Sequence, residues 1–190
     1  GWYLTLPNKL TPKQVVSILR AALAGDLWQQ YQLQKLMHDT WPRFAKCANE
    51  LRAAVSYSDF RVVPFSVKGK PPTPSAQAKA DLVEAAFASM KPDSFGDEQG
   101  FTGTVYDYTD AILSGLSMQE TLWDPVRRMP DGKYVQLPRA TAFVDPRHFA
   151  FGSDGRLGVF NGDVQDMLAV ENDADRYVCS RFKSQSGSPL

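Results

Sequence analysis

Residues that carry redox or metal chemistry are scarce in this sequence. Its 190 residues include only two cysteines, Cys47 and Cys179, and two histidines, His38 and His148. The cysteines lie far apart and outside a CxxC pattern, which suits a reducing compartment better than a disulfide framework. Together with the histidines they form a zinc site only if the fold brings them close to one another. We therefore expect no metal ion and no cofactor, and we interpret His38 as a histidine at a helix C-terminus.

Long apolar runs and short catalytic motifs are also missing. No run approaches the roughly 20 apolar residues that span a bilayer, and no basic segment followed by an apolar block opens the chain. The Walker-type phosphate loop and the patterns GxGxxG, HExxH and GxSxG are absent. Gly100–Gly103 resembles a GxxG clamp, but we interpret it as a turn that starts a helix. We expect neither membrane insertion nor one of these compact catalytic sites.

The sequence has no net charge, but the two signs are distributed unequally. There are 21 Lys and Arg against 21 Asp and Glu, with 12 basic and 7 acidic residues in 1–95 and 9 and 14 in 96–190. Zero net charge is not typical of a dedicated nucleic-acid-binding module, which remains a third hypothesis and predicts salt-sensitive binding. The asymmetry fits either chance dispersal over a solvated surface or head-to-tail self-association between a basic and an acidic face.

Helical periodicity dominates the first half of the sequence. Thr11 and Gln14 form a capping box around Pro12, and Gly25 ends the apolar pattern that follows. Asp26 can cap a second helix, and Pro42 can start a third. These signals predict helices over residues 12–24, from Asp26 to about residue 40, and from Pro42 to about residue 55.

The pattern then changes before helical spacing returns. Residues 60–65 are β-branched and aromatic, and Pro64 among them indicates an edge strand or a strand end. Residues 68–75 are rich in Pro and Gly and predict a loop. Helical spacing resumes over residues 82–90 and again over 101–116. Residues 1–116 are therefore expected to form a mainly helical part with one short strand.

Short strands bounded by Asp, Gly or Pro fill the second half. Pro130–Gly132 is a turn signal that folds residues 121–123 and 134–137 into a hairpin. Further strands are expected at residues 142–144, 148–151, 157–160, 167–170 and 177–179, and we interpret this β-rich part, 117–190, as a meander. Helices followed by strands predict an α+β fold with a largely antiparallel sheet.

Five basic residues lie where we expect exposed contact elements. Lys68 and Lys70 lie in the predicted loop, and Arg127, Arg128 and Lys133 surround the tip of the predicted hairpin. Any of them could touch phosphate groups nonspecifically, although a solvated surface is the plainer interpretation. We nevertheless take the loop 68–74 and the hairpin near 127–133 as candidate contact elements.

Acidic residues raise an alternative hypothesis from another class. Asp107 and Asp110 share a helix face, and five further acids follow at Asp163, Asp166, Glu171, Asp173 and Asp175. Paired carboxylates serve glycoside hydrolysis or bind divalent metals where burial separates their pKa values. Solvated faces are the plainer interpretation of both groups. The alternative is a fragment of a metal-dependent hydrolase or nuclease, whose activity Asp163→Asn or Asp166→Asn would abolish.

Several motifs, taken in order, resemble the N-terminal half of the Mu-type phage portal protein family. Individually they are short, but together they extend over nearly the whole chain. They are Leu10–Pro12, Val15–Val16, Ile18–Leu19, Ala24–Asp26, Leu33, Leu36–Met37, Asp39, Arg52–Val55, Phe60–Pro64, Asp110–Ile112, Gly115, Ser117, Glu120, Trp123, Pro146–Phe149 and Ser186–Pro189.

The resemblance implies a structural role without catalysis. It implies a ring of identical subunits, usually twelve, at one vertex of the capsid, through which a terminase drives double-stranded DNA. Its partners would be the major capsid protein, the terminase, a head-tail adaptor protein and the passing DNA, in a virion component assembled in the host cytoplasm. The chain would form one continuous, wing-like region, with the stem and clip following residue 190. Gly1 in place of Met, and a loop-like end at residues 184–190, also lead us to expect a fragment.

Overall fold

Helices form the first part of the chain and strands the second. The computed structural model describes residues 9–90, 100–152, 155–160, 167–169 and 175–182. The helices are α1 (Pro12–Leu23), α2 (Trp28–Thr40), α3 (Pro42–Ser56), α4 (Pro74–Ser89), α5 (Gly100–Tyr108) and α6 (Ala111–Ser114). The strands are β1 (Leu116–Trp123), β2 (Arg127–Arg128), β3 (Tyr134–Val135), β4 (Pro138–Phe143), β5 (Phe149–Phe151), β6 (Leu157–Phe160), β7 (Met167–Ala169) and β8 (Tyr177–Arg181), with a short 3₁₀ helix at Pro146–His148. This arrangement confirms the predicted α+β fold.

Local capping signals set where the first helices begin. The Thr11 hydroxyl accepts the backbone N–H of Gln14 and the Gln14 side chain accepts the N–H of Thr11, so the predicted capping box forms at α1. The Asp26 carboxylate accepts the N–H of Trp28 at 3.3 Å, although the residue directly before α2 is Leu27. Pro42 is the first residue of α3, as predicted.

The main sheet has three strands in the order β4-β1-β8, with both neighbours antiparallel to β1. The chain therefore does not form the simple meander that we predicted. Strands β5, β6 and β7 do follow one another in a second antiparallel sheet, but β8 returns to pair with the free edge of β1. The predicted hairpin is longer than expected, because β1 and β4 continue into the short pair β2 and β3.

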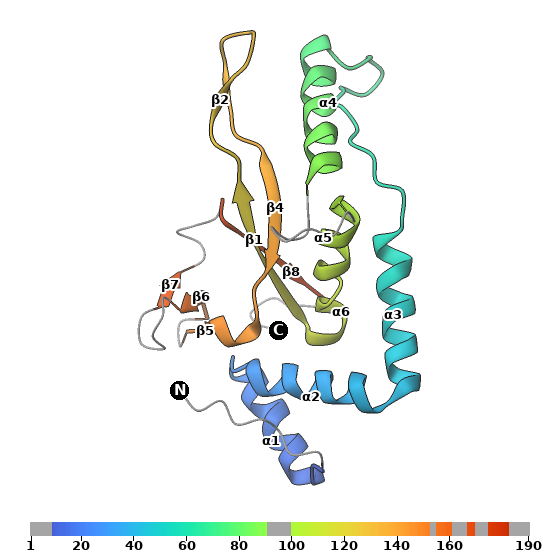
Figure 1. Cartoon of the computed structure of the whole chain (residues 1–190), viewed down its shortest axis with the longest axis vertical. Coiled ribbons are helices and arrows are strands. Elements are labelled where there is room, and N and C mark those ends of the chain that lie inside the picture. The colour runs from blue at the N-terminus through green and yellow to red at the C-terminus, as the bar shows by residue number, and fades with distance from the viewer. Residues whose placement is uncertain (1–8, 91–99, 153–154, 161–166, 170–174, 183–190) are drawn as a thin grey trace.

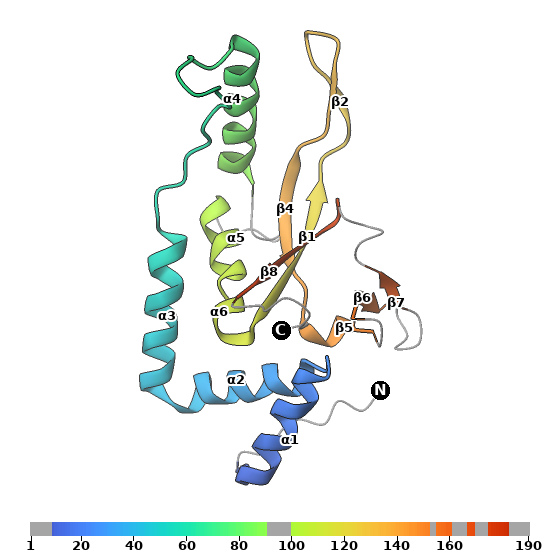
Figure 2. The same ribbon diagram turned by 180° about the vertical axis from the view of Figure 1, so that it is seen from behind.

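Helices lie on one side of the main sheet (Figure 1), and an apolar cluster of side chains lies on its other side. Helices α5 and α6 pack on β1, α4 packs on β4, and α3 packs on α5 rather than on the sheet. Helix α2 crosses beneath them and leads to α1 at one end of the molecule, while the β2–β3 pair projects at the other end (Figure 2). None of the helices in the described ranges combines the length and apolar character that a bilayer crossing requires.

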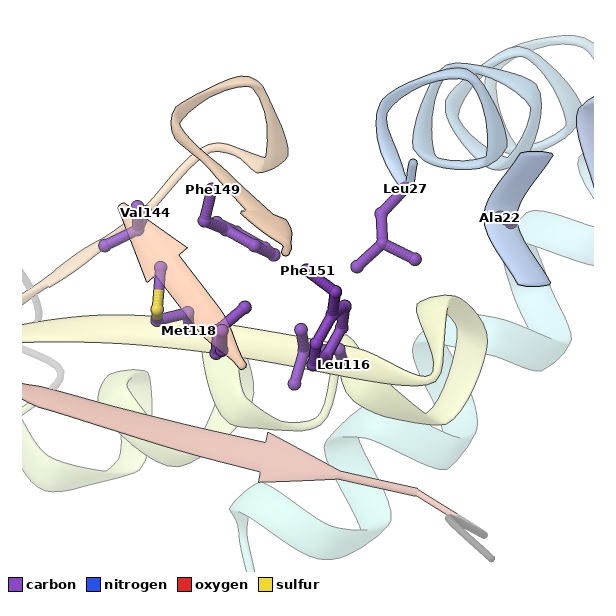
Figure 3. Packing of buried hydrophobic residues seen from close by; sticks show 8 residues of the cluster. Ala22, Leu27, Leu116, Met118, Val144, Phe149 and Phe151 are labelled. Carbon is purple, nitrogen blue, oxygen red and sulfur yellow. The ribbon is translucent and has the colours of Figure 1, made fainter. Parts of the chain in front are cut away.

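The apolar cluster joins the main sheet to the second sheet and to the turn between α1 and α2. Met118 and Leu116 of β1 point toward Phe149 and Phe151 of β5 (Figure 3). Ala22 and Leu27 close the cluster from the helical side. The turn comes so close to β5 that a Cβ at Gly25, whose φ is +104°, would lie 3.0 Å from the Cβ of Phe151. A glycine is therefore needed there for both its conformation and its size.

The opposite face of β1 is polar as well as buried. Ser117 and Gln119 are 1% and 0% exposed, and the Ser117 hydroxyl donates to the carbonyl of Asp107. The hydroxyls of Thr104 in α5 and Thr141 in β4 lie 2.8 Å apart and share a hydrogen bond in the same layer. The small side chains in this layer are thus hydrogen-bonded, whereas the buried Gln119 amide has no partner among the described residues.

Two predictions from the sequence are wrong in the helical part. Residues 60–65 form no strand, because no other strand lies beside them within the described residues and Pro64 lacks an N–H. The single helix expected over 101–116 is divided, since α5 ends at Tyr108, α6 ends at Ser114, and Leu116 already belongs to β1. Gly115, with φ of +80°, makes the left-handed turn between α6 and β1.

Met118 offers a test of the apolar cluster. Met118→Ala should lower the free energy of unfolding by about 2–5 kcal/mol, because it opens a cavity at a fully buried position. Chemical denaturation would measure the change. Val16→Ala on α1 is the control, since that side chain is 46% exposed and its loss should cost less than about 0.5 kcal/mol. Equal effects of the two substitutions would contradict the packing described here.

Candidate functional site

The five basic residues proposed from the sequence lie on two segments at one end of the molecule. The loop before α4 carries Lys68 and Lys70, and the β2–β3 pair with its turn carries Arg127, Arg128 and Lys133. Both segments reach the same end in both views, opposite to α1 (Figures 1 and 2). All five residues are exposed. The fold thus places at the same end of the molecule two segments that are about 60 positions apart in the sequence.

The hairpin holds its basic residues on a tight turn. Arg127 pairs with Val135 and Arg128 with Tyr134, and the N–H of Met129 donates to the carbonyl of Lys133 at 2.7 Å. Gly132, with φ of +83°, occupies the position that the turn requires to be left-handed. Lys133 forms an ion pair with Asp131 at 3.0 Å, and its hydrogen bonds lower the pKa of the Asp131 carboxyl. Arg127 and Arg128 form no ion pair with any residue that the structure describes.

The loop before α4 presents its lysines in the same way. The N–H of Lys70 donates to the carbonyl of Val67 at 2.9 Å, so the lysines flank Gly69 in a turn. Helix α4 begins directly afterwards, where the Thr73 hydroxyl accepts the N–H of Ala76. Neither lysine forms an ion pair within the described ranges. The loop therefore contributes positive charge that no described acidic side chain pairs with.

The two segments carry more positive than negative charge. Residues 66–80 and 124–139 together contain seven basic residues and two acidic ones. Exposed cations without carboxylate partners attract phosphate groups or an acidic protein surface through forces that salt screens. This end can therefore bind through charge.

A second cluster, around Arg52 and Asp110, was not anticipated from the sequence. Asp110 was predicted to lie on a solvated face, but its side chain is only 15% exposed and that of Arg52 only 16%. The Arg52 guanidinium lies 3.7 Å from the Asp110 carboxylate, covers the ring of Tyr106 at 4.0 Å and donates to the Tyr106 carbonyl. Asp110 is buried because α3, which carries Arg52, packs beside α5. The helical periodicity of the sequence does not reveal this packing.

This cluster lines a small cavity at the junction of α2, α3 and α6. The cavity measures about 200 Å³ and is lined by Tyr31, Gln34, His38, Arg52, Asp110 and Leu113, among others. The Gln34 amide donates to the Leu113 carbonyl and ties α2 to α6. Burial raises the pKa of the Asp110 carboxyl, although Arg52 and a hydrogen bond from Ser114 oppose the shift. Burial also raises the pKa of Tyr31. These contacts hold the helices together, and we assign the cluster a structural role.

The remaining candidate residues are not brought together. His38 lies in the last turn of α2, as interpreted, with Nε2 3.3 Å from Asn49 Oδ1, whereas His148 ends the 3₁₀ helix. Cys47 is exposed on α3 and Cys179 lies in β8. Within the described residues, no three His, Cys, Asp or Glu side chains are grouped closely enough to hold a metal ion.

The acidic stretch and the GxxG motif have different outcomes. Asp163, Asp166, Glu171 and Asp173 lie outside the described residues. Asp175 is exposed, and its backbone carbonyl accepts the indole N–H of Trp123 at 2.7 Å. Gly100 is the first residue of α5 and Gly103 is buried within that helix, which confirms the helix-start interpretation.

Comparison with known proteins gives one consistent answer. A family model described as the portal protein of Mu bacteriophage matches residues 31–190. The chain is 30% identical over 118 residues to the Mu-like prophage FluMu protein gp29 of Haemophilus influenzae, covering 60% of this chain and 20% of that protein. It is 29% identical over 145 residues to the portal protein of Escherichia phage Mu, covering 76% of this chain and 25% of that one. The matched part therefore spans about a fifth to a quarter of these curated relatives.

The Arg52–Asp110 cluster predicts how stability depends on pH. Because the folded-state pKa of Asp110 lies above its ordinary value of 3.8, the folded chain binds this proton more tightly than the unfolded chain. The stability that the fold gains from protonated Asp110 is complete below pH 3.8 and is lost as the pH rises through the folded-state pKa. Asp110→Asn, which does not ionise, should therefore gain stability relative to the wild type between pH 4 and 7, as measured by urea denaturation.

Asp145 supplies the matched control for this pH series. Burial opposes its ionisation, but hydrogen bonds from the Arg147 side chain and N–H outweigh it and lower the pKa of the carboxyl below 3.8. The ionised Asp145 carboxylate therefore makes its full contribution to the free energy of unfolding above pH 4. Asp145→Asn should lower that free energy by a constant amount from pH 4 to 7. Parallel pH profiles for Asp110→Asn and the wild type would contradict the burial of Asp110.

Proposed function

Since the chain belongs to the family of portal proteins of Mu bacteriophage, we propose that it is part of a portal subunit. Identical subunits pack side by side into a closed ring, usually of twelve, at one vertex of the capsid. The observation that carries this proposal is the family match over residues 31–190. In a heterologous interface, different faces of successive copies meet. Such an interface forms a ring when the rotations from one copy to the next add up to a full turn.

The proposed ring surrounds a channel for double-stranded DNA during packaging and ejection. Its partners are the terminase, the major capsid protein and a head-tail adaptor protein, and the DNA passes without sequence-specific contacts. The subunit is assembled in the host cytoplasm and becomes part of the virion. This role is structural and needs no catalytic residues. Within it, the helical part and the β-rich part together form one continuous, wing-like region, because α5 and α6 pack directly on β1.

We assign the positive end of the molecule a contact role within this assembly. Lys68, Lys70, Arg127, Arg128 and Lys133 are exposed at that end and would meet the phosphate backbone of DNA. The hydrolase or nuclease alternative rests on Asp163 and Asp166. The family match over residues 31–190 supports the structural role instead.

Ring formation is the direct test of the proposed function. The natural full-length chain that contains this segment should form closed rings with a central channel about as wide as duplex DNA. Negative-stain electron microscopy together with particle mass would show this. Uniform monomers over a range of salt concentrations would contradict the proposal.

The contact role predicts a specific change in salt dependence. Replacing Lys68, Lys70, Arg127, Arg128 and Lys133 by Ala in the full-length chain should leave the rings intact. The slope of log K for DNA binding against log salt concentration should become shallower by about 0.9 for each phosphate group that the protein no longer neutralises. Lys13→Ala with Arg20→Ala on α1, at the opposite end, is the control and should leave the slope unchanged. An unchanged slope in the five-residue variant would contradict the assignment.

A further inference from the structure

The hairpin formed by β2 and β3 carries positive charge on both of its faces. Arg128 pairs directly with Tyr134, and Arg127 pairs directly with Val135. Residues directly opposite one another in an antiparallel pair share a face, while successive residues of a strand point to opposite faces. Arg128 therefore lies on one face with Tyr134, and Arg127 lies on the other face with Val135. Both arginines are exposed, and neither forms an ion pair with a residue that the structure describes.

The turn holds the charge of Arg128 at the tip of the hairpin. A Cβ at Gly132 would lie 3.6 Å from Nη2 of Arg128, so the guanidinium reaches the turn. The N–H of Gly132 donates to the carbonyl of Met129 at 2.9 Å, and the N–H of Lys133 donates to the Asp131 carboxylate at 3.1 Å. These hydrogen bonds fix the backbone on which the arginine is carried.

Both faces of the hairpin are accessible to a ligand. Tyr134 is 73% exposed on the Arg128 face, and Val135 is only half-buried on the Arg127 face. The pair projects beyond the main sheet at one end of the molecule in both views (Figures 1 and 2). A two-stranded hairpin is at best marginally stable in water by itself, so a ligand that contacts both faces would also stabilise this one.

Charge on two opposite faces distinguishes between a flat partner and a grooved one. A flat acidic protein surface contacts one face of a hairpin and leaves the arginine of the other face in water. The walls of a DNA groove are two phosphate backbones, so each face of an inserted element meets a wall. The major groove is about 12 Å wide and admits a two-stranded β-ribbon, whereas the minor groove is only about 6 Å wide. The hairpin therefore suits the major groove in both charge and size.

We propose that the β2–β3 hairpin inserts into the major groove of duplex DNA, with Arg127 and Arg128 on the phosphates of opposite walls. This inference rests on the proposed function, in which the same end of the molecule meets DNA, and specifies the manner of contact. It adds Tyr134 as a contact residue, because a phenol hydroxyl on the Arg128 face can donate to a phosphate oxygen. Phosphate contacts carry no sequence information, as the passage of any DNA sequence requires.

Single substitutions on the two faces test the proposal in full-length rings. Arg127→Ala and Arg128→Ala should each weaken binding to duplex DNA by about threefold or more at low salt. Each should make the slope of log K against log salt concentration shallower by about 0.9, because each removes one phosphate contact. Tyr134→Phe should weaken binding by about twofold without changing the slope, since it removes a hydroxyl and no charge. Lys13→Ala, an exposed residue of α1, is the control and should change neither quantity.

Modified DNA tests the groove directly. Duplexes whose cytosines carry a glucosylated hydroxymethyl group at C5 have bulky substituents in the major groove and unchanged phosphates, because C5 of a pyrimidine faces that groove. Wild-type rings should bind such a duplex at least about tenfold more weakly than an unmodified duplex of the same sequence. Netropsin, which fills the minor groove, should change binding by less than about twofold.

The outcomes separate this inference from the proposed function. Absence of rings would overturn the proposed function and this inference with it. Intact rings that bind both duplexes equally, or that lose affinity on replacement of only one of the two arginines, would overturn the inference and leave the ring standing. Inhibition by netropsin but not by the modified cytosines would place the hairpin in the minor groove and overturn it as well. Arginine variants that bind DNA normally but no longer bind another virion protein would assign the hairpin to that protein, which also overturns the inference.

Discussion

Burial of β1 on both faces is the constraint on which the rest of the structure depends. Leu116 and Met118 face the apolar cluster, while Ser117 and Gln119 face α5, so four successive residues are withdrawn from water. Each face demands its own covering layer, and both edges of the strand are paired. Because β1 also continues into the projecting hairpin, it determines where the positive end lies. Because α5 covers it and α3 covers α5, it determines which face α3 turns outward.

Features governed by neighbouring residues could be predicted from the sequence. The capping box at Thr11, the proline starts of α1 and α3, and the turn before Gly132 each depend on a few adjacent residues. Features that depend on a distant partner could not be predicted. The pairing of β8 with β1 and the burial of Asp110 beside Arg52 bring together segments far apart in the chain. Residues 60–65 have the composition of a strand, but a strand needs a neighbour, and the described residues provide none.

The candidate site shows the same difference between what neighbouring residues determine and what distant contacts determine. That Lys68, Lys70, Arg127, Arg128 and Lys133 would be exposed follows from their loop and turn surroundings. That they gather at one end depends on how α4 packs against β4, which no local pattern encodes. The resemblance to portal proteins included Arg52 and Asp110 as two unrelated motif positions, and the fold supplies a physical reason for both, because their side chains meet.

The pairing of β1 with β8 has a consequence for synthesis on the ribosome. Leu116 pairs with Arg181, so the second edge of β1 stays open until about 65 further residues have been translated. At about 5–20 residues per second this interval lasts roughly 3–13 s, during which the hairpin and α5 can already form. The nascent chain therefore exposes an unpaired edge beside the most apolar part of its future core. Completion of the sheet is a late event, and a growing chain that stalls before β8 offers that edge to chaperones or to other nascent chains.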